Sequence, residues 1–160
     1  MTVWESVRLA NELLHKHSEL NMWDVTTNNR KHAFGLCGYH SREIQLSEYL
    51  IPFMSEEAIR NTIIHEIAHA LTKGHSHDNV WRRKCIELGG DGKRVGGKEK
   101  YEDGGEAIIE YRKTRSKYTL TCPCCGHISF LERRPKRSYS CGKHVGGYNE
   151  KYKMILTQNF

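Results

Sequence analysis

The sequence predicts an α+β protein, in which a core of helices and a small antiparallel sheet is followed by a small metal-binding β ribbon. Apolar residues with helical spacing alternate with short strand-like stretches over the first half of the chain. Cysteines gather near the C-terminal end, where the chain also becomes strongly basic. A length of 160 residues suffices for one compact domain and a small appendage. We place the core at residues 1–105 and the basic ribbon at residues 106–160.

The first element is expected to be an amphipathic helix over residues 2–17. Thr2 and Glu5 have the spacing of a capping box, in which each side chain bonds the backbone of the other residue. Apolar residues then recur on one helical face, at Val3, Val7, Ala10 and Leu14.

Three short strands are expected next, at residues 22–28, 32–39 and 42–47. The third strand alternates its side chains between two faces, and Tyr39, His40 and Ser41 form the turn that precedes it. These strands are expected to form the small antiparallel sheet.

Two further helices complete the predicted core. Ser55 is expected to cap the first of them, with acidic residues in its first turn, and this helix ends near Gly74. The second covers residues 78–88 and ends at Gly89. Residues 89–105 contain seven glycines among charged residues, which predicts a loop or linker. The tail from residue 106 is strand-like.

Composition argues against several classes of protein. No apolar run approaches the roughly 18 residues that a membrane span needs. The first residues lack the basic start and apolar core of a signal peptide. We therefore expect a protein that is not secreted and not membrane-bound, in the cytoplasm or associated with the nucleoid. In such a compartment, six Cys and ten His indicate metal binding rather than disulfides.

Charge is distributed unevenly along the chain. Residues 1–110 carry 14 Lys and Arg against 17 Asp and Glu, whereas residues 111–160 carry 11 against 2. Such asymmetry indicates a polyanionic partner, and DNA is the expected one. The alternative is a solvated basic surface that aids solubility.

The helix that follows Ser55 contains the motif His65-Glu66-Ile67-Ala68-His69. Because four residues make about one helical turn, both imidazoles project from the same side and can hold one Zn²⁺. Glu66 then flanks the position of a metal-bound water and can act as the general base.

A catalytic zinc needs a third protein ligand, and two candidates follow the motif. His75 has the spacing found in one class of zinc proteases, but that class has Gly where this chain has Thr72. His77 lies at the start of the next helix, with Trp81 one turn later as an apolar anchor. We favour His77 and keep His75 as the alternative.

These residues resemble the SprT/Spartan group of zinc metalloproteases. The resemblance rests on the two-histidine motif, on Gly74-His75-Ser76-His77 with Trp81, on Ile44-Gln45-Leu46-Ser47, and on the Cys-bearing ribbon. It covers most of residues 2–147. In that family a His four residues before an aromatic supplies the third ligand, as His77 does relative to Trp81. The resemblance implies a zincin-like protease core, peptide-bond hydrolysis and, for the cellular members, cleavage of proteins crosslinked to DNA.

A second metal site is predicted in the tail. Cys122 and Cys125 form a C-x-x-C knuckle, and Cys141 and His144 follow after fifteen intervening residues. This spacing is typical of a structural zinc ribbon with a Cys₃His ligand set. The related family usually has Cys at the position of His144, and His127 is a competing ligand.

Two basic segments of the tail are the candidate nucleic-acid contacts, because cations beside aromatic rings suit a phosphate backbone with stacked bases. An ordinary charged hairpin is the alternative. The candidate residues are Arg112, Lys113, Arg115 and Lys117, and Arg133, Arg134, Lys136 and Arg137.

The sequence therefore predicts a monomeric metallopeptidase with one catalytic and one structural zinc, which acts on protein substrates associated with DNA. His75 and Tyr101 are candidates for stabilising the oxyanion. Two rival interpretations remain: a metallopeptidase without a nucleic-acid role, and a DNA-binding or adaptor protein with a non-catalytic core.

Overall fold

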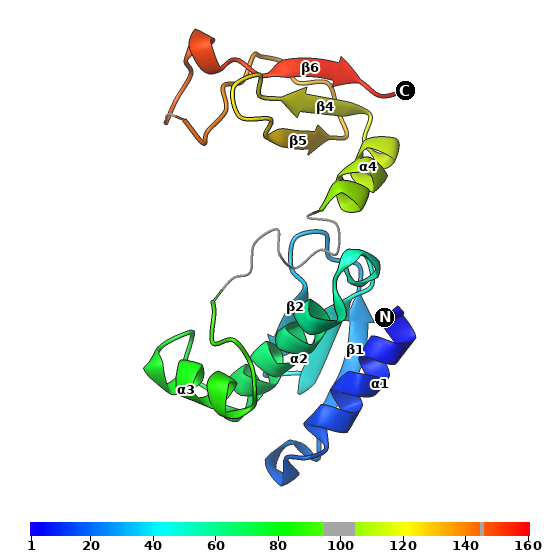
Figure 1. Ribbon diagram of the computed structural model, residues 1–160, viewed down its shortest axis with the longest axis vertical. Helices are drawn as coiled ribbons and strands as arrows, with labels where there is room; N and C mark the ends of the chain where they lie inside the picture. The colour runs from blue at the N-terminus through cyan, green and yellow to red at the C-terminus, as the bar shows by residue number, and fades with distance from the viewer. Residues whose placement is uncertain (95–104, 145) are drawn as a thin grey trace. The chain divides into compact units, whose positions relative to one another are not determined.

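The computed structural model describes residues 1–94, 105–144 and 146–160. Most of the glycine-rich segment, and Tyr101 with it, lies outside the described residues. The chain divides into two compact units, Met1–Gly105 and Glu106–Phe160 (Figure 1). The mixed helices and small sheets confirm the predicted α+β class. Within the described ranges, no helix is long and apolar enough to cross a membrane.

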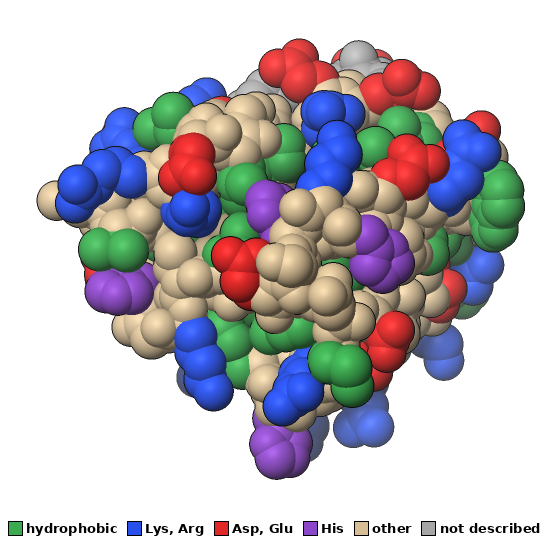
Figure 2. All heavy atoms as spheres, turned by 90° about the horizontal axis from the view of Figure 1, so that it is seen from below, with side chains coloured by type: hydrophobic (Ala, Val, Ile, Leu, Met, Phe, Trp, Pro, Cys, Tyr) green, Lys and Arg blue, Asp and Glu red, His purple; other side chains and the backbone are tan. Residues whose placement is uncertain are grey.

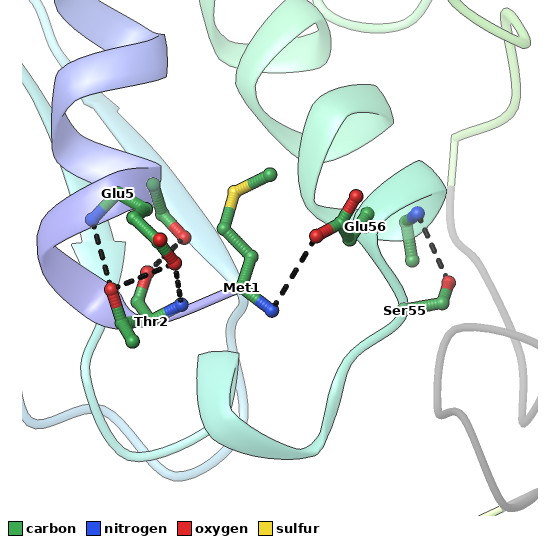
Figure 3. Close-up of polar contacts among 7 residues, drawn as sticks. Met1, Thr2, Glu5, Ser55 and Glu56 are labelled. Atoms are coloured by element: carbon green, nitrogen blue, oxygen red, sulfur yellow. Dashed lines mark hydrogen bonds and ion pairs between the residues drawn. The ribbon is translucent and has the colours of Figure 1, made fainter.

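Helix α1 (Val3–Leu14) and helix α2 (Glu56–Leu71) both begin at side-chain caps. The backbone N–H of Thr2 donates to the Glu5 carboxylate at 2.7 Å, and the backbone N–H of Glu5 donates to the Thr2 hydroxyl at 3.2 Å. The Ser55 hydroxyl accepts from the backbone N–H of Ala58 at 3.2 Å. Figure 3 shows both caps, together with an ion pair that joins the N-terminal amine to Glu56.

The sheet of the first unit is mixed, which corrects the expected small antiparallel sheet. Its strands are β1 (Asp24–Asn28), β2 (Gly35–Gly38) and β3 (Glu43–Ser47), in the order β1-β3-β2. β2 and β3 are antiparallel, but β1 and β3 are parallel. The chain reverses direction twice between β1 and β3, so β3 regains the direction of β1. The Ser47 hydroxyl secures the first reversal by donating to the carbonyl of Arg30 at 2.6 Å.

The core of this unit lies between the sheet and its two long helices. α1 contacts α2 and β1, and α2 also contacts β2 and β3 (Figure 1). The central side chains are almost fully buried, namely Leu14, Ile44, Leu46, Ile59, Ile63 and Ile67. Helix α3 (Asn79–Glu87) docks on α2 through Trp81, which packs with Ile64 and Ala68. This packing fixes α2, the helix that carries the two-histidine motif.

The second unit begins with a helix, α4 (Glu106–Arg115), where the sequence indicated strand-like structure. Ile108 is the one buried residue of α4, so its apolar periodicity is weak. Charge supports the helix instead, because Glu106 lies in the first turn and three basic residues lie in the last turn.

A three-stranded antiparallel sheet follows α4. It consists of β4 (Tyr118–Thr121), β5 (Ile128–Leu131) and β6 (Ile155–Gln158), in the order β5-β4-β6. Its small core contains Leu120, Met154 and two buried cysteines, Cys122 and Cys141. Two of the predicted metal ligands, Cys122 and Cys141, therefore form part of the packing of this unit.

Candidate active site and metal centres

Three imidazoles converge on one point of the first unit. The Nε2 atom of His77 lies 3.0 Å from Nε2 of His65 and 3.0 Å from Nε2 of His69. A tetrahedral zinc ion holds its nitrogen ligands about 3.3 Å apart, as bond lengths near 2.05 Å require. We call these residues the three-histidine cluster, and its donor set and spacing fit a zinc ion.

Local structure explains how each imidazole reaches the cluster. His65 and His69 lie one turn apart on α2, as the motif predicts. His77 comes from the loop before α3 and has a positive φ of 58°, which few non-glycine residues adopt. Asp78 fixes this loop because its carboxylate accepts from the backbone N–H groups of Val80 and Trp81 at 2.9 and 3.1 Å.

His75 lies outside the three-histidine cluster. Its Nδ1 atom is 2.7 Å from the Asp78 carboxylate, and 43% of its side chain is exposed. Its backbone has a separate role, since it forms a hydrogen bond with the imidazole of His69. Such a bond orients a ligand ring and selects its tautomer. Of the two candidate third ligands, the structure therefore brings His77, and not His75, to the other imidazoles.

Trp81 forms the floor beneath the cluster. Its ring centroid lies 4.7 Å from that of His65, 5.2 Å from that of His69 and 4.6 Å from that of His77. The residue is only 1% exposed. The indole therefore restricts all three imidazoles from the protein side and leaves their opposite side to the cleft.

Burial keeps two of the imidazoles neutral. It is the main reason that the pKa of His69 falls to about 4, and the neighbouring His77 lowers this pKa further. Burial also lowers the pKa of His77, with a smaller contribution from the charge of Arg94. A ring nitrogen binds a metal ion only when it is unprotonated, so both residues are ready for a cation at neutral pH.

Glu66 lies in the same cleft as the three-histidine cluster. The cleft has a volume of about 580 Å³ and is bordered by α2, β2 and the loop before α3. Glu66 is only 8% exposed, and the negative charge of its carboxylate acts on the Cys37 thiol of β2. Burial, and then the charge of Glu66, raise the pKa of the Cys37 thiol to about 12. Cys37 is therefore a neutral thiol at neutral pH.

Two residues, one in strand β2 and one just after it, contact α2 in ways that sequence reasoning missed. The Tyr39 hydroxyl, just beyond the strand, donates to the carbonyl of His69 at 3.1 Å. Burial raises the pKa of Tyr39. Gly35 faces Glu66 so closely that a Cβ on it would lie 2.8 Å from Glu66 Cγ. Neither contact has a local sequence signal, because each joins two segments that are about thirty residues apart in the chain. Only the folded sheet brings these segments together.

The second cluster lies in the C-terminal unit and contains Cys122, Cys125, Cys141 and His144. The Sγ atoms of Cys125 and Cys141 are 3.8 Å apart, and Cys122 Sγ is 3.6 Å from His144 Nε2. A tetrahedral zinc ion with bonds of about 2.3 Å to sulfur and 2.05 Å to nitrogen requires about 3.8 and 3.6 Å for these two separations. The Cys₃His set therefore fits a structural zinc ion.

Hydrogen bonding prepares one thiol of this cluster for a metal. Burial opposes ionisation of Cys122, but hydrogen bonds from the backbone of Cys125 and Cys124 and from the side chains of Cys125 and His144 together lower the pKa of Cys122 to about 6. Burial raises the pKa of Cys141. His127, the competing ligand, lies outside the cluster and approaches Ser129 at 3.5 Å. Cys124 also lies outside, and its thiol donates to the carbonyl of Lys151 at 3.7 Å.

The candidate nucleic-acid residues all belong to the second unit. On α4, Arg112 lies over the ring of Phe130 at 5.9 Å and Lys113 pairs with Glu110 at 3.3 Å. The exposed segment after β5 carries the second group, and Arg137 lies over the ring of Tyr139 at 5.5 Å. The remaining members of the two groups are exposed, namely Arg115, Lys117, Arg133, Arg134 and Lys136.

A groove connects part of the second group. It has a volume of about 540 Å³ and combines Arg134, Lys136, Arg137 and Tyr139 with apolar residues of β6. Basic and acidic side chains are interspersed over the face of the molecule drawn in Figure 2.

Comparison with protein families gives one match, to the SprT-like family over residues 4–98. The matched region contains all of the three-histidine cluster and Glu66, and it confirms the family resemblance of the sequence. No curated protein gives a significant match.

The matches among solved structures include two metallopeptidase zymogens. The metallopeptidase zymogen of Methanocaldococcus jannaschii jannalysin is 17% identical, with a TM-score of 0.44 over 66% of this chain and 95% of that chain. The metallopeptidase zymogen of Pyrococcus abyssi abylysin is 17% identical, with a TM-score of 0.42 over 69% of this chain and 94% of that chain. At this level of identity and overlap, neither likeness bears on what the chain does.

Proposed function

The chain belongs to the SprT-like family, and on that premise we propose that it is a zinc-dependent peptidase. One observation carries the proposal: the imidazole nitrogen of His77 lies 3.0 Å from those of His65 and His69, beside a buried carboxylate in the same cleft. A structural zinc site has four protein ligands, whereas a catalytic site leaves one position free. Three imidazoles with an adjacent base match the catalytic kind.

The proposed ligands are the three residues of the cluster, and the proposed general base is Glu66. A zinc ion held there would polarise the scissile carbonyl and lower the pKa of its water ligand toward about 7. Glu66 accepts the proton of the attacking water and then donates it to the leaving amine. Trp81 and the backbone of His75 hold the imidazoles in place during both transfers.

The edge of β2 offers a place for an extended polypeptide. The backbone N–H of Ser47 donates to the carbonyl of Phe34 at 2.9 Å, which fixes the alternation of the β2–β3 ladder. The backbone groups of Gly35 and Cys37 then point away from β3, toward the edge of β2 that no other strand of the described residues pairs with. A substrate strand paired with them would pass beside Glu66 in the cleft.

A single substitution tests the catalytic proposal. Glu66→Gln removes the base and preserves the shape of the side chain, so we expect zinc content to stay constant while cleavage of fluorescein-labelled casein falls by at least about 100-fold. The matched control is Glu57→Gln on an exposed part of the same helix. If Glu66→Gln cleaves casein as fast as the unaltered protein, the catalytic assignment is wrong.

We propose further that the second unit docks on DNA, so that the substrates are DNA-associated proteins, including crosslinked ones, in the cytoplasm or at the nucleoid. The support is the excess of 11 Lys and Arg over 2 Asp and Glu in residues 111–160 and the groove in which Arg137 covers Tyr139. Phosphate contacts give affinity that falls steeply with salt. A gel-shift titration at several salt concentrations tests this, and no shift of DNA even at low salt would favour a peptidase without a nucleic-acid role.

A further inference from the structure

We propose that Gly35 is a positioning residue that sets the place of the Glu66 carboxylate. The inference rests on the proposed function, in which Glu66 is the base. A Cβ built on Gly35 would lie 2.8 Å from Glu66 Cγ and 2.9 Å from its Oε1 atom. It would also lie 3.0 Å from the Cγ2 methyl of Thr62, one helical turn before Glu66. Only a residue without a side chain leaves Glu66 where it is.

Space, and not backbone conformation, is the reason for glycine at this position. Gly35 does not have a positive φ, in contrast to Gly74 and Gly89, so any residue could adopt its backbone. Strand β2 instead approaches α2 so closely at Gly35 that its backbone forms one wall of the space around Glu66. The carboxylate is therefore confined between the strand and its own helix.

The parts around this contact differ in how easily they can move. β2 is paired with β3 along its whole length, and α2 is fixed by the buried core. The Glu66 side chain moves more easily than either element, since its χ angles can rotate. An added methyl group at Gly35 should therefore move the carboxylate and leave the fold intact. This small change would be costly for catalysis, because misplacement of a reacting group by about 1 Å can cost 100-fold in rate.

Gly35→Ala tests the proposal, with Gly38→Ala as the matched control in the same strand. A Cβ on Gly38 would lie 2.6 Å from the Ser41 hydroxyl, a flexible group in an exposed turn, and at an ordinary 3.5 Å from the Glu43 carbonyl oxygen, and Gly38 does not line the cleft. We expect both variants to bind zinc and to melt like the unaltered protein. For Gly35→Ala we expect kcat on a peptide from a casein cleavage site to fall by about 10- to 100-fold with little change in KM. Gly38→Ala should retain its kcat.

Two readouts separate positioning from a general structural defect. Crystal structures of the zinc-loaded variants should show Glu66 displaced in Gly35→Ala by 0.6 Å or more, which is the step from 2.8 Å to an ordinary contact of 3.4 Å. The solvent deuterium isotope effect on kcat should rise in Gly35→Ala, because proton transfer by Glu66 becomes slower. A smaller population of active molecules would leave that isotope effect unchanged.

The proposal is overturned if Gly35→Ala keeps full kcat, if its carboxylate does not move, or if its activity falls only in proportion to its zinc content. If Gly35→Ala does not fold, the double variant Gly35→Ala with Thr62→Ser takes its place. It lacks the Thr62 methyl group that would lie 3.0 Å from the new Cβ, and the same measurements are made on it. Failure of the proposed function would look different, because the unaltered protein would then cleave no peptide while the two crystal structures still report the position of Glu66.

Discussion

His77 reaches the other two imidazoles because its backbone turns into the left-handed region just before the Asp78 cap. His75 is two residues away and forms its closest polar contact with Asp78 instead. We therefore predict that His77→Asn, which tolerates a positive φ, lowers zinc content from about two ions per chain to about one. His75→Ala should retain about two. Elemental analysis of the dialysed proteins measures both, and the reverse pattern would make His75 the third ligand.

Tyr39 acts on the same cluster from outside it. Tyr39→Phe removes the hydrogen bond to the His69 carbonyl, and a bond of this kind contributes about 0.5–1.5 kcal/mol. We expect the zinc affinity of the core site to fall by about 2- to 10-fold, measured by competition with a chromophoric chelator. Tyr139→Phe in the second unit is the control and should leave this affinity unchanged.

The depressed pKa of His69 predicts how the metal-free protein responds to acid. Its folded-state pKa is about 4, below the ordinary value of 6.5. Between these values the unfolded chain binds a proton that the folded chain does not, so stability falls as pH decreases through this window. Urea titrations of the metal-free protein at several pH values should show the unfolding midpoint decrease. In His69→Gln the decrease should be smaller, and an equal decrease would contradict the assignment.

At the scale of elements, α3 depends on one side chain. Trp81 anchors this helix and also covers the three-histidine cluster. Trp81→Ala should lower the free energy of unfolding by about 3–5 kcal/mol, as loss of a buried aromatic does. It should also weaken zinc binding at the core site. Val80→Ala changes an exposed neighbour in the same helix and should do neither.

The elements differ in how well their local sequence predicts them. The capping box at Thr2 and Glu5 and the Ser55 cap are local signals, and both helices begin where these signals predict. The ribbon ligands were also predictable, because two knuckles define their own spacing. Helix α4 was not, since it buries only Ile108 and thus lacks a clear apolar period. The direction of β1 relative to β3 depends on two chain reversals that no single segment encodes.

The same distinction applies within the candidate site. His65, Glu66 and His69 lie in one helical turn, so their spacing alone places them together. The left-handed turn at His77 selects it over His75, and spacing does not reveal that turn. Gly35 and Tyr39 meet α2 only through the folded sheet. The contacts of Gly35 and Tyr39 with α2 were therefore beyond prediction, whereas the grouping of His65, Glu66 and His69 was not.

At the scale of the molecule, the chain consists of two units with separate cores. Cys122→Ser removes one ligand of the ribbon, whose small core contains little besides the cluster itself. Metal binding supplies much of the folding free energy in such a unit. Hydrogen exchange should therefore show loss of protection in β4, β5 and β6 of this variant, while α2 and β3 remain protected. Loss of protection throughout both units would show that they fold as one.

The two metal centres also differ in their donor atoms, since one offers only imidazole nitrogen and the other mainly cysteine sulfur. Peroxide attacks thiolates far more readily than imidazoles. Oxidative stress would therefore damage the centre in the basic unit first and leave the three-histidine centre intact. The protein would then keep its proposed peptidase centre while losing the module proposed to direct it to DNA.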